Sequence, residues 1–269
     1  MNSEILINVT REERRVALLE GGQVVELYVE RKRDASLVGN IYKGRVVKIL
    51  PGMQSAFIDI GLEKAAFLYV ADIKTDVEDY TSLIEDEESS SIDAIEVSKK
   101  GRQDLSIEEI IQEGQEMLVQ VSKDPIGTKG ARVTTYVTLP GRYLVLMPGV
   151  EHVGISRRIS DEAERTRLKS IVEILRPKGY GMIIRTASEG CTEEEIRKDL
   201  EFLLLLWENI QKKRDKVSAP SLLYSDLDLA FRSVRDLMNQ DVERLVIDDE
   251  TEFERIREFV RTYFPKLLE

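Results

Sequence analysis

The segment KGRVVKILPGMQSAFIDIG, residues 43–61, decides the fold of the central part of this chain. Runs of β-branched residues alternate in it with glycine and proline at short, even spacing, which is typical of a small closed β-barrel. Working outward from this segment, we predict five barrel strands, at residues 41–50, 56–60, 65–70, 116–121 and 131–137. An interruption at about 74–107 separates the third strand from the fourth.

Charge is segregated along the chain. The 269 residues include 39 basic and 50 acidic ones, for a net charge of −11, which taken globally argues against a nucleic-acid-binding protein. However, residues 75–97 contain nine acidic residues and no basic one, whereas residues 123–186 contain twelve basic and six acidic residues. The acidic total therefore does not exclude RNA. Our hypothesis for the acidic insertion 75–97 is a loop that competes with RNA for a basic groove.

The two ends of the chain predict one small α/β domain. Near the N-terminus, strands are expected at residues 5–9, 14–19 and 24–29, with the last two joined by Gly21-Gly22. Near the C-terminus, we expect a helix at 227–238, a strand at 245–247, and a helix that opens with the capping box Thr251…Glu254. Residues 4–30 and 226–264 would form one domain into which the rest of the chain is inserted.

Strands and helices alternate between the barrel and the C-terminal part. Strands are predicted at 143–147 and 181–185. The helix between them is expected to be capped by Ser160, and its apolar face has the spacing i, i+3, i+4, i+7 at Leu168, Ile171, Val172 and Leu175. The helix after 181–185 opens with the capping box Thr192…Glu195. We therefore predict an α+β multidomain fold.

Composition excludes several classes of protein. Apolar residues make up 42% of the chain, as a globular core requires. No apolar run approaches the roughly 20 residues that a membrane-spanning helix needs, and residues 1–4 do not resemble a signal peptide. Cys191 is the only cysteine and His152 the only histidine, which argues against an internal disulfide and against a cysteine- or histidine-rich metal site. We expect a cytoplasmic protein.

The barrel offers a candidate surface for nucleic acid. Five-stranded OB barrels bind oligonucleotides on their second and third strands, where Phe57 and Phe67 lie at corresponding positions. An exposed aromatic ring stacks on any base, for about 1–3 kcal/mol per base. A phenylalanine on a barrel strand is also a common core residue, so both interpretations stay open. The candidate cations for the RNA backbone are Lys43, Arg45, Lys48, Lys123 and Lys129.

Longer motifs carry a resemblance to a known family. GRV at 44–46, PG at 51–52, FIDIG at 57–61, GQ at 114–115 and VQV at 119–121 resemble the S1 RNA-binding domain. The surrounding motifs narrow the resemblance. They are NIYKG at 40–44, TKGA at 128–131, YLVLMP at 143–148, GISRRI at 154–159 and IRTA at 184–187. Together, these motifs make nearly the whole chain similar to the N-terminal half of the ribonuclease E/G family.

The resemblance implies a role for each segment. Residues 1–35 and about 221–269 would form an RNase H-like subdomain. Residues 36–135 would form an S1-type OB barrel with the acidic loop inserted at about 74–107, and residues 136–220 a 5′ sensor. Members of the family cut single-stranded RNA with magnesium, favour 5′-monophosphorylated ends and self-associate. The implied partner is therefore single-stranded RNA, preferably with a 5′-monophosphate.

The resemblance also implies individual site residues. A 5′-monophosphate carries nearly two negative charges at neutral pH, and the paired donors of arginine match its oxygens. The implied 5′-phosphate-binding residues are Arg185 and Thr186, completed by Val145, Gly141 and Arg157. Phe57, Phe67 and Lys129 would guide the RNA strand.

The resemblance further implies that the cleavage site lies outside this chain. An RNase H nuclease holds magnesium with clustered carboxylates, but the first strand here offers Asn8 and no carboxylate. We interpret Asp248, Asp249 and Glu250 as the end of a strand and the start of a capped helix. The family's catalytic DNase I-like domain, with metal-binding aspartates, and its cysteine-bound zinc would follow the region where this chain stops. We thus expect no catalytic residue, metal ligand or cofactor in residues 1–269, and magnesium and structural zinc in the full-length enzyme.

Two alternatives stay open. The first is a non-catalytic S1-domain adaptor, which would bind RNA without sensing its 5′ end. The second is a metal-dependent nuclease built on the RNase H-like part, which the missing first-strand carboxylate disfavours. A reading frame that continues past Glu269 with paired aspartates and a Cys-x-x-Cys motif would favour the family nuclease over the adaptor.

Overall fold

The computed structural model describes residues 3–31, 36–74, 106–238 and 242–263. The described chain is a mixed α+β structure with two compact units, residues 1–36 with 227–269 and residues 37–226. The acidic insertion 75–97 lies outside the described residues, so its predicted loop and its competition with RNA stay predictions. The finer boundaries that the resemblance implies, near residues 35, 135 and 220, also stay predictions.

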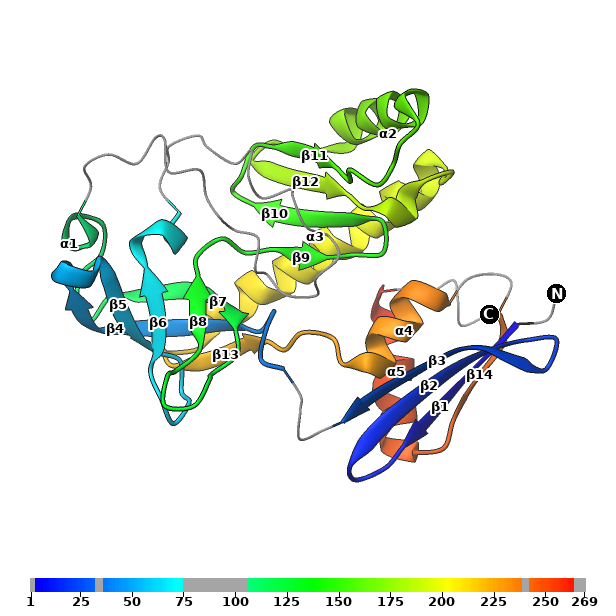
Figure 1. The fold of residues 1–269 in the computed structure, drawn as a ribbon, viewed down its shortest axis with the longest axis horizontal. Coiled ribbons are helices and arrows are strands. Elements are labelled where there is room, and N and C mark those ends of the chain that lie inside the picture. Colours follow the sequence, from blue (N-terminus) through cyan, green and yellow to red (C-terminus); the bar gives the residue numbers. More distant parts are fainter. Residues whose placement is uncertain (1–2, 32–35, 75–105, 239–241, 264–269) are drawn as a thin grey trace. The chain divides into compact units, whose positions relative to one another are not determined.

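The first unit is a four-stranded sheet with two helices on one face (Figure 1). The strand order is β14-β1-β2-β3, in which only β1 and β14 run parallel. Strands from the beginning and the end of the described chain therefore share one sheet. The elements are β1 (Ser3–Val9), β2 (Glu13–Glu20), β3 (Gln23–Arg31), α4 (Leu229–Leu237), β14 (Val242–Ile247) and α5 (Glu250–Tyr263).

Alternating apolar side chains form the core of the first unit. Ile5, Ile7 and Val16 are buried on the sheet, and alternation places all side chains of one parity on one face. Phe231 of α4 and Phe259 of α5 pack edge to face, with ring centroids 5.1 Å apart. The sheet and both helices thus share one apolar layer.

A five-stranded barrel forms much of the second unit, as the sequence predicted. Pairing runs from β4 to β5, β6, β8 and β7, and β7 returns to β4, which closes the barrel. Strand β8 is shorter than the predicted 131–137, and β13 (Ser221–Tyr224) extends the sheet beside β4. The barrel strands are β4 (Ile41–Leu50), β5 (Ser55–Asp59), β6 (Ala66–Tyr69), β7 (Glu116–Lys123) and β8 (Arg132–Thr134). Short helices adjoin them at η2 (Pro51–Met53), η3 (Val70–Asp72) and α1 (Ile107–Ile110).

Close packing in the barrel interior explains why residue 44 is a glycine. Val46, Ile58 and Leu68 are buried in the barrel core. A Cβ on Gly44 would lie 2.6 Å from Cγ2 of Ile58, a distance at which something must shift. Glycine at this position therefore lets β4 pass close to β5, and a larger residue would overpack the core.

A second sheet of the same unit has the order β11-β12-β10-β9 (Figure 1). Strand β10 is antiparallel to β12, and β11 is parallel to it. The start of β10 and the ends of β11 and β12 therefore lie at one end of the sheet. The elements are β9 (Leu139–Pro140), β10 (Leu144–Pro148), β11 (Val153–Ile155), α2 (Glu162–Leu175), β12 (Tyr180–Ile184), η4 (Thr186–Ser188) and α3 (Glu193–Lys216).

Helix starts show where local sequence signals suffice and where they compete. The capping box of α3 is confirmed, because Thr192 and Glu195 bond reciprocally. The other two predicted caps were wrong. Asp161 caps α2 in place of Ser160, and Asp249 accepts from the Glu252 amide at 2.8 Å ahead of Thr251. In each case an aspartate, which caps as well as serine or threonine, takes the role.

Candidate functional site

Three aromatic side chains form a row on strands β5 and β6. Phe57 and Phe67 oppose each other in the ladder, with ring centroids 5.6 Å apart. Tyr69 lies two residues after Phe67, hence on the same face, and its ring centroid is 4.5 Å from that of Phe67. Both phenylalanines are partly exposed, and Tyr69 is 39% exposed. The row thus presents aromatic surface to solvent, on which a flat ligand can stack.

The sequence analysis did not identify Tyr69 or Arg132, whose guanidinium contacts the Tyr69 ring. Cζ of Arg132 lies 4.8 Å from the centroid of the Tyr69 ring, within the range of a cation–π contact. The carboxylate of Asp72 holds this guanidinium by two bonds, of 2.8 and 3.1 Å. The i, i+2 spacing of Phe67 and Tyr69 was a usable signal. The position of Arg132 next to Tyr69 could not be predicted from the sequence, because it depends on the parallel pairing of β6 with β8.

Two predicted cations lie beside this aromatic row. Lys48 is exposed and pairs with Phe57 across strands β4 and β5. Lys129 is exposed in the turn that precedes β8. The next residue, Gly130, packs so closely on the strand β6 side that a Cβ there would lie 2.0 Å from the Ala65 carbonyl oxygen. Both lysines are thus exposed on segments next to β5 and β6, and exposed cations favour the phosphate backbone of a nucleic acid.

Lys43 and Arg45 have different surroundings. Each lies 3.0 Å from a carboxylate oxygen of Glu116. Lys43 also donates to the carbonyl oxygens of Arg214 and Val217, at 3.3 and 2.9 Å, and Arg45 donates to that of Ala219 at 3.1 Å. These cations fasten the segment after α3 to the barrel. Their predicted contact with RNA stays a prediction.

The contacts of Glu116 predict a pH-dependent contribution to stability. Hydrogen bonds from Lys43 and Arg45, and from the Ala219 amide, lower the pKa of Glu116 from 4.5 to about 2. A carboxyl whose pKa is depressed by folding stabilises the protein above its unfolded-state pKa, and this contribution is lost as the pH falls through the folded-state pKa. We expect Glu116→Gln to have a lower urea midpoint of unfolding than the wild type at pH 7. The difference between the two midpoints should narrow below pH 4.5 and disappear near pH 2.

Glu63→Gln is the matched control for this prediction, because Glu63 is an exposed carboxylate on the loop between β5 and β6. Its urea midpoint should follow that of the wild type at every pH. A gap for Glu116→Gln that is as wide at low pH as at pH 7 would contradict the assigned role of the carboxylate.

A second candidate site lies at one end of the second sheet. Leu144 and Ile155 both pair with Ile184, so the segments that precede β10 and follow β11 and β12 meet there. Val145 lies one residue further into β10, opposite Ile183. The fold therefore brings the predicted phosphate-binding residues together from three separate segments. They are Gly141, Val145, Arg157, Arg185 and Thr186.

Arg185 and Thr186 are fixed by backbone and hydroxyl contacts. The Arg185 amide donates to the Tyr143 carbonyl at 2.9 Å, and its guanidinium donates to the carbonyl oxygens of Gly141 and Arg142. The hydroxyls of Thr186 and Ser156 share a hydrogen bond of 2.8 Å. Arg157, the residue after Ser156, is exposed. Arginine and hydroxyl residues thus lie on neighbouring segments at one end of the sheet, a combination suited to an anion with several oxygens.

Sequence reasoning also missed Asp199 of α3, whose side chain underlies this area. Asp199 is 5% exposed. Its carboxylate accepts hydrogen bonds from the amides of Arg142, Tyr143 and Leu144, at 2.9, 2.8 and 2.9 Å. A signal was present, because Asp199 falls within the apolar stripe of its helix beside Leu200. A carboxylate buried on such a stripe requires hydrogen-bond donors.

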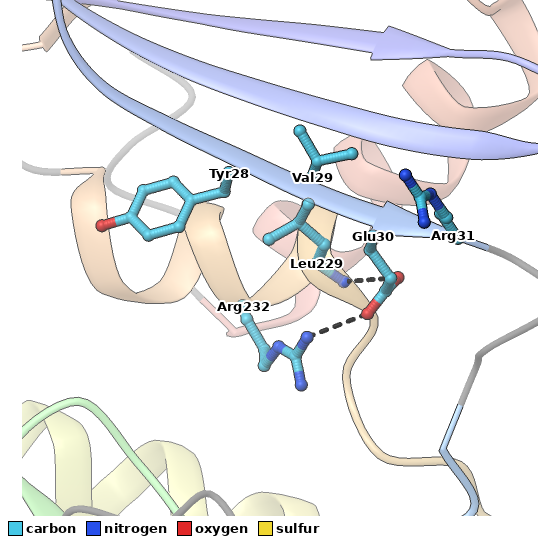
Figure 2. A pocket seen from close by; sticks show the side chains of 6 residues that line it. All are labelled: Tyr28, Val29, Glu30, Arg31, Leu229 and Arg232. Carbon is cyan, nitrogen blue, oxygen red and sulfur yellow. Dashed lines mark hydrogen bonds and ion pairs between the residues drawn. The ribbon is translucent and has the colours of Figure 1, made fainter.

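The first unit contains a pocket of 580 Å³ between β3 and α4 (Figure 2). Glu30 at its wall accepts from the Leu229 amide at 3.1 Å and from Arg232 at 2.9 Å. Tyr28 donates to Glu26, and this bond raises the pKa of Tyr28 to about 12. Glu30 and Arg232 bind each other, and Glu30 also binds the first turn of α4, so we assign these two residues a structural role.

The ends of β1 and β14 do not provide a metal site. Asn8 donates to one oxygen of Asp248 at 2.5 Å, and the Val9 amide donates to the other at 2.8 Å. The Asp248 carboxylate therefore joins two strands, and it lies between the end of β14 and the start of α5, where the sequence interpretation placed it. Within the described ranges, no group of three or more His, Cys, Asp and Glu side chains could hold a metal ion. No helix in the same ranges is long and apolar enough to cross a membrane.

Comparison with known proteins identifies the family. Residues 138–269 match the model of the ribonuclease E/G family. The chain belongs to the ribonuclease E/G family. The expectation drawn from the short motifs is thus confirmed at the level of the family.

Named relatives of the family cover nearly all of this chain. Over 264 residues it is 46% identical to Ribonuclease G of Haemophilus influenzae, with 98% of this chain and 51% of the relative aligned. Ribonuclease G of Escherichia coli K12 is 43% identical over 267 residues, with 99% of this chain and 52% of the relative aligned. Ribonuclease E of a Nostoc species is 37% identical over 248 residues, with 92% of this chain and 33% of the relative aligned. The chain spans about half the length of the Ribonuclease G relatives it matches.

Proposed function

We propose that this chain binds single-stranded RNA on its barrel and recognises a 5′-monophosphate at the end of its second sheet. The observation that carries the proposal is the convergence of Gly141, Arg157, Arg185 and Thr186 from three chain segments. Membership of a family of ribonucleases supports RNA as the ligand. The aromatic row of Phe57, Phe67 and Tyr69 supports binding of unpaired bases, since a stacked duplex hides base faces.

The parts of the fold take matching roles in this proposal. The barrel is an S1-type domain that guides the RNA strand, and the second sheet with α2 and α3 is the 5′ sensor. The first unit is an RNase H-like scaffold. Its strand order and parallel pairing of β1 with β14 support this reading.

We further propose that the chain recognises RNA without cleaving it. The Asn8–Asp248 contact supports this, because the carboxylate is already bonded to an amide side chain and a backbone amide. Asp248 therefore does not fit a ligand of catalytic magnesium, and Cys191 alone does not fit structural zinc. In this proposal, both metals are held by residues outside 1–269.

The decisive experiment compares two RNAs that differ only at the 5′ end. An unstructured oligonucleotide labelled at its 3′ end would carry either a 5′-monophosphate or a 5′-hydroxyl, and fluorescence anisotropy would give both Kd values. We expect tighter binding of the monophosphate. Equal Kd values would favour the alternative of an S1-type adaptor without a 5′ sensor. Cleavage in magnesium that Asp248→Asn abolishes would place the reaction in this chain and overturn the proposal of recognition alone.

A further inference from the structure

Asp199 is bonded to three consecutive backbone amides of the turn that precedes β10. One carboxylate oxygen accepts from Arg142, and the other accepts from both Tyr143 and Leu144. Consecutive amides that converge on one carboxylate fix the orientation of each peptide plane between them. The turn 141–144 is therefore held in one conformation by a side chain from α3.

Gly141 shows how closely the turn fits Asp199. A Cβ at this position would lie 2.5 and 2.6 Å from the two carboxylate oxygens. Such distances are well inside van der Waals contact, and the obstacle is a buried group that is itself bonded three times. Glycine at 141 is thus required by Asp199.

The opposite side of the same turn faces Arg185. The carbonyl oxygens of Gly141 and Arg142 accept hydrogen bonds from the Arg185 guanidinium. The carbonyl oxygen of Tyr143 accepts from the backbone amide of Arg185 and, at 2.7 Å, from the Ser188 hydroxyl. Asp199 thus accepts hydrogen bonds from the amides of the turn, and Arg185 donates hydrogen bonds to its carbonyl oxygens. A change in the orientation of these peptides would move the acceptors that hold the guanidinium.

We infer that Asp199 is a positioning residue for 5′-phosphate recognition, acting through the turn 141–144 on the guanidinium of Arg185. The inference rests on the function proposed above. Because Asp199 occupies the amides of residues 142–144, these amides do not contact the phosphate, which is left to Arg185, Thr186 and the other residues of the proposed site. Asp199 itself touches neither phosphate nor RNA.

Asp199→Asn tests this role with almost no change in side-chain size. One of the two oxygens becomes an NH₂ group, which donates and cannot accept. Whichever oxygen is replaced, at least one amide of the turn loses its acceptor and faces another donor. We expect the ratio of the two Kd values, 5′-hydroxyl RNA over 5′-monophosphate RNA, to fall about tenfold. The Kd for 5′-hydroxyl RNA should stay within about twofold of the wild type.

Two further variants keep the test decisive if Asp199→Asn folds poorly. Gly141→Ala retains the carboxylate but displaces the turn, and we expect it to lower the same ratio. Asp215→Asn is the matched control, because Asp215 is an exposed carboxylate near the other end of α3, and its ratio should equal that of the wild type. Thermal unfolding of all variants identifies a general loss of structure.

The outcomes separate the inference from the proposed function. A wild-type ratio of one would refute phosphate sensing itself. A wild-type preference for monophosphate that Asp199→Asn and Gly141→Ala leave unchanged would overturn the positioning role alone. Equal weakening of both RNAs in the two variants would assign Asp199 to general stability and would likewise overturn the inference.

Discussion

Arg185→Ala is expected to weaken binding of 5′-monophosphorylated RNA by about 10- to 100-fold, since hydrogen bonds to charged groups contribute about 1.5–3 kcal/mol. The Arg185 guanidinium donates to the carbonyl oxygens of Gly141 and Arg142, just before β10 at the end of the second sheet. Binding of the same RNA with a 5′-hydroxyl should change little, because the lost cation has no phosphate to pair with there. Anisotropy titrations with the two RNAs measure both effects.

Lys178→Ala is the charge-matched control for this variant. Lys178 is exposed and precedes the opposite end of the same strand, β12. It should lower both affinities slightly and equally, as the loss of a distant cation does. If Arg185→Ala weakens the binding of both RNAs to the same extent, Arg185 is a general RNA contact and the phosphate site must lie elsewhere.

Phe57→Ala and Phe67→Ala are expected to weaken both RNAs alike, by about 5- to 100-fold for each substitution, because stacking on one base contributes about 1–3 kcal/mol. The chemical group at the 5′ end of the RNA should not change this loss, since the aromatic row lies on the barrel and the proposed phosphate site on the second sheet. The two rings also contact each other, so the double variant should lose less than the sum of the single losses. Anisotropy with both RNAs, and thermal unfolding in parallel, measure these effects.

Tyr28→Ala provides the control for removing an exposed aromatic ring. Tyr28 is 41% exposed on β3, close to the 39% of Tyr69, but it lies on the sheet of the first unit. It should leave RNA affinity unchanged. Loss of affinity in Tyr28→Ala, with none in Phe57→Ala, would move the RNA-binding surface away from the barrel.

Local sequence signals predicted the elements well where one short segment determines the outcome. The barrel strands follow from alternation and turn residues within ten or so positions, and the capping box at Thr192 and Glu195 is complete within four residues. The start of α5 was misplaced because Asp249 offered an equally good cap two residues earlier. These signals are local, so competing local signals are their main source of error.

The sequence by itself determined the five-stranded barrel, the membership in the ribonuclease E/G family and the residue types of the proposed phosphate site. Only the tertiary structure decided which of them meet. It places Gly141, Arg157 and Arg185 at one end of a sheet, binds Lys43 and Arg45 to Glu116, and turns Asp199 toward the amides of residues 142–144. The physical reason is that strand pairing between distant segments selects the partners of each side chain. A carboxylate on the apolar stripe of a helix predicts that hydrogen-bond donors must lie nearby, but only the packed fold shows which donors these are.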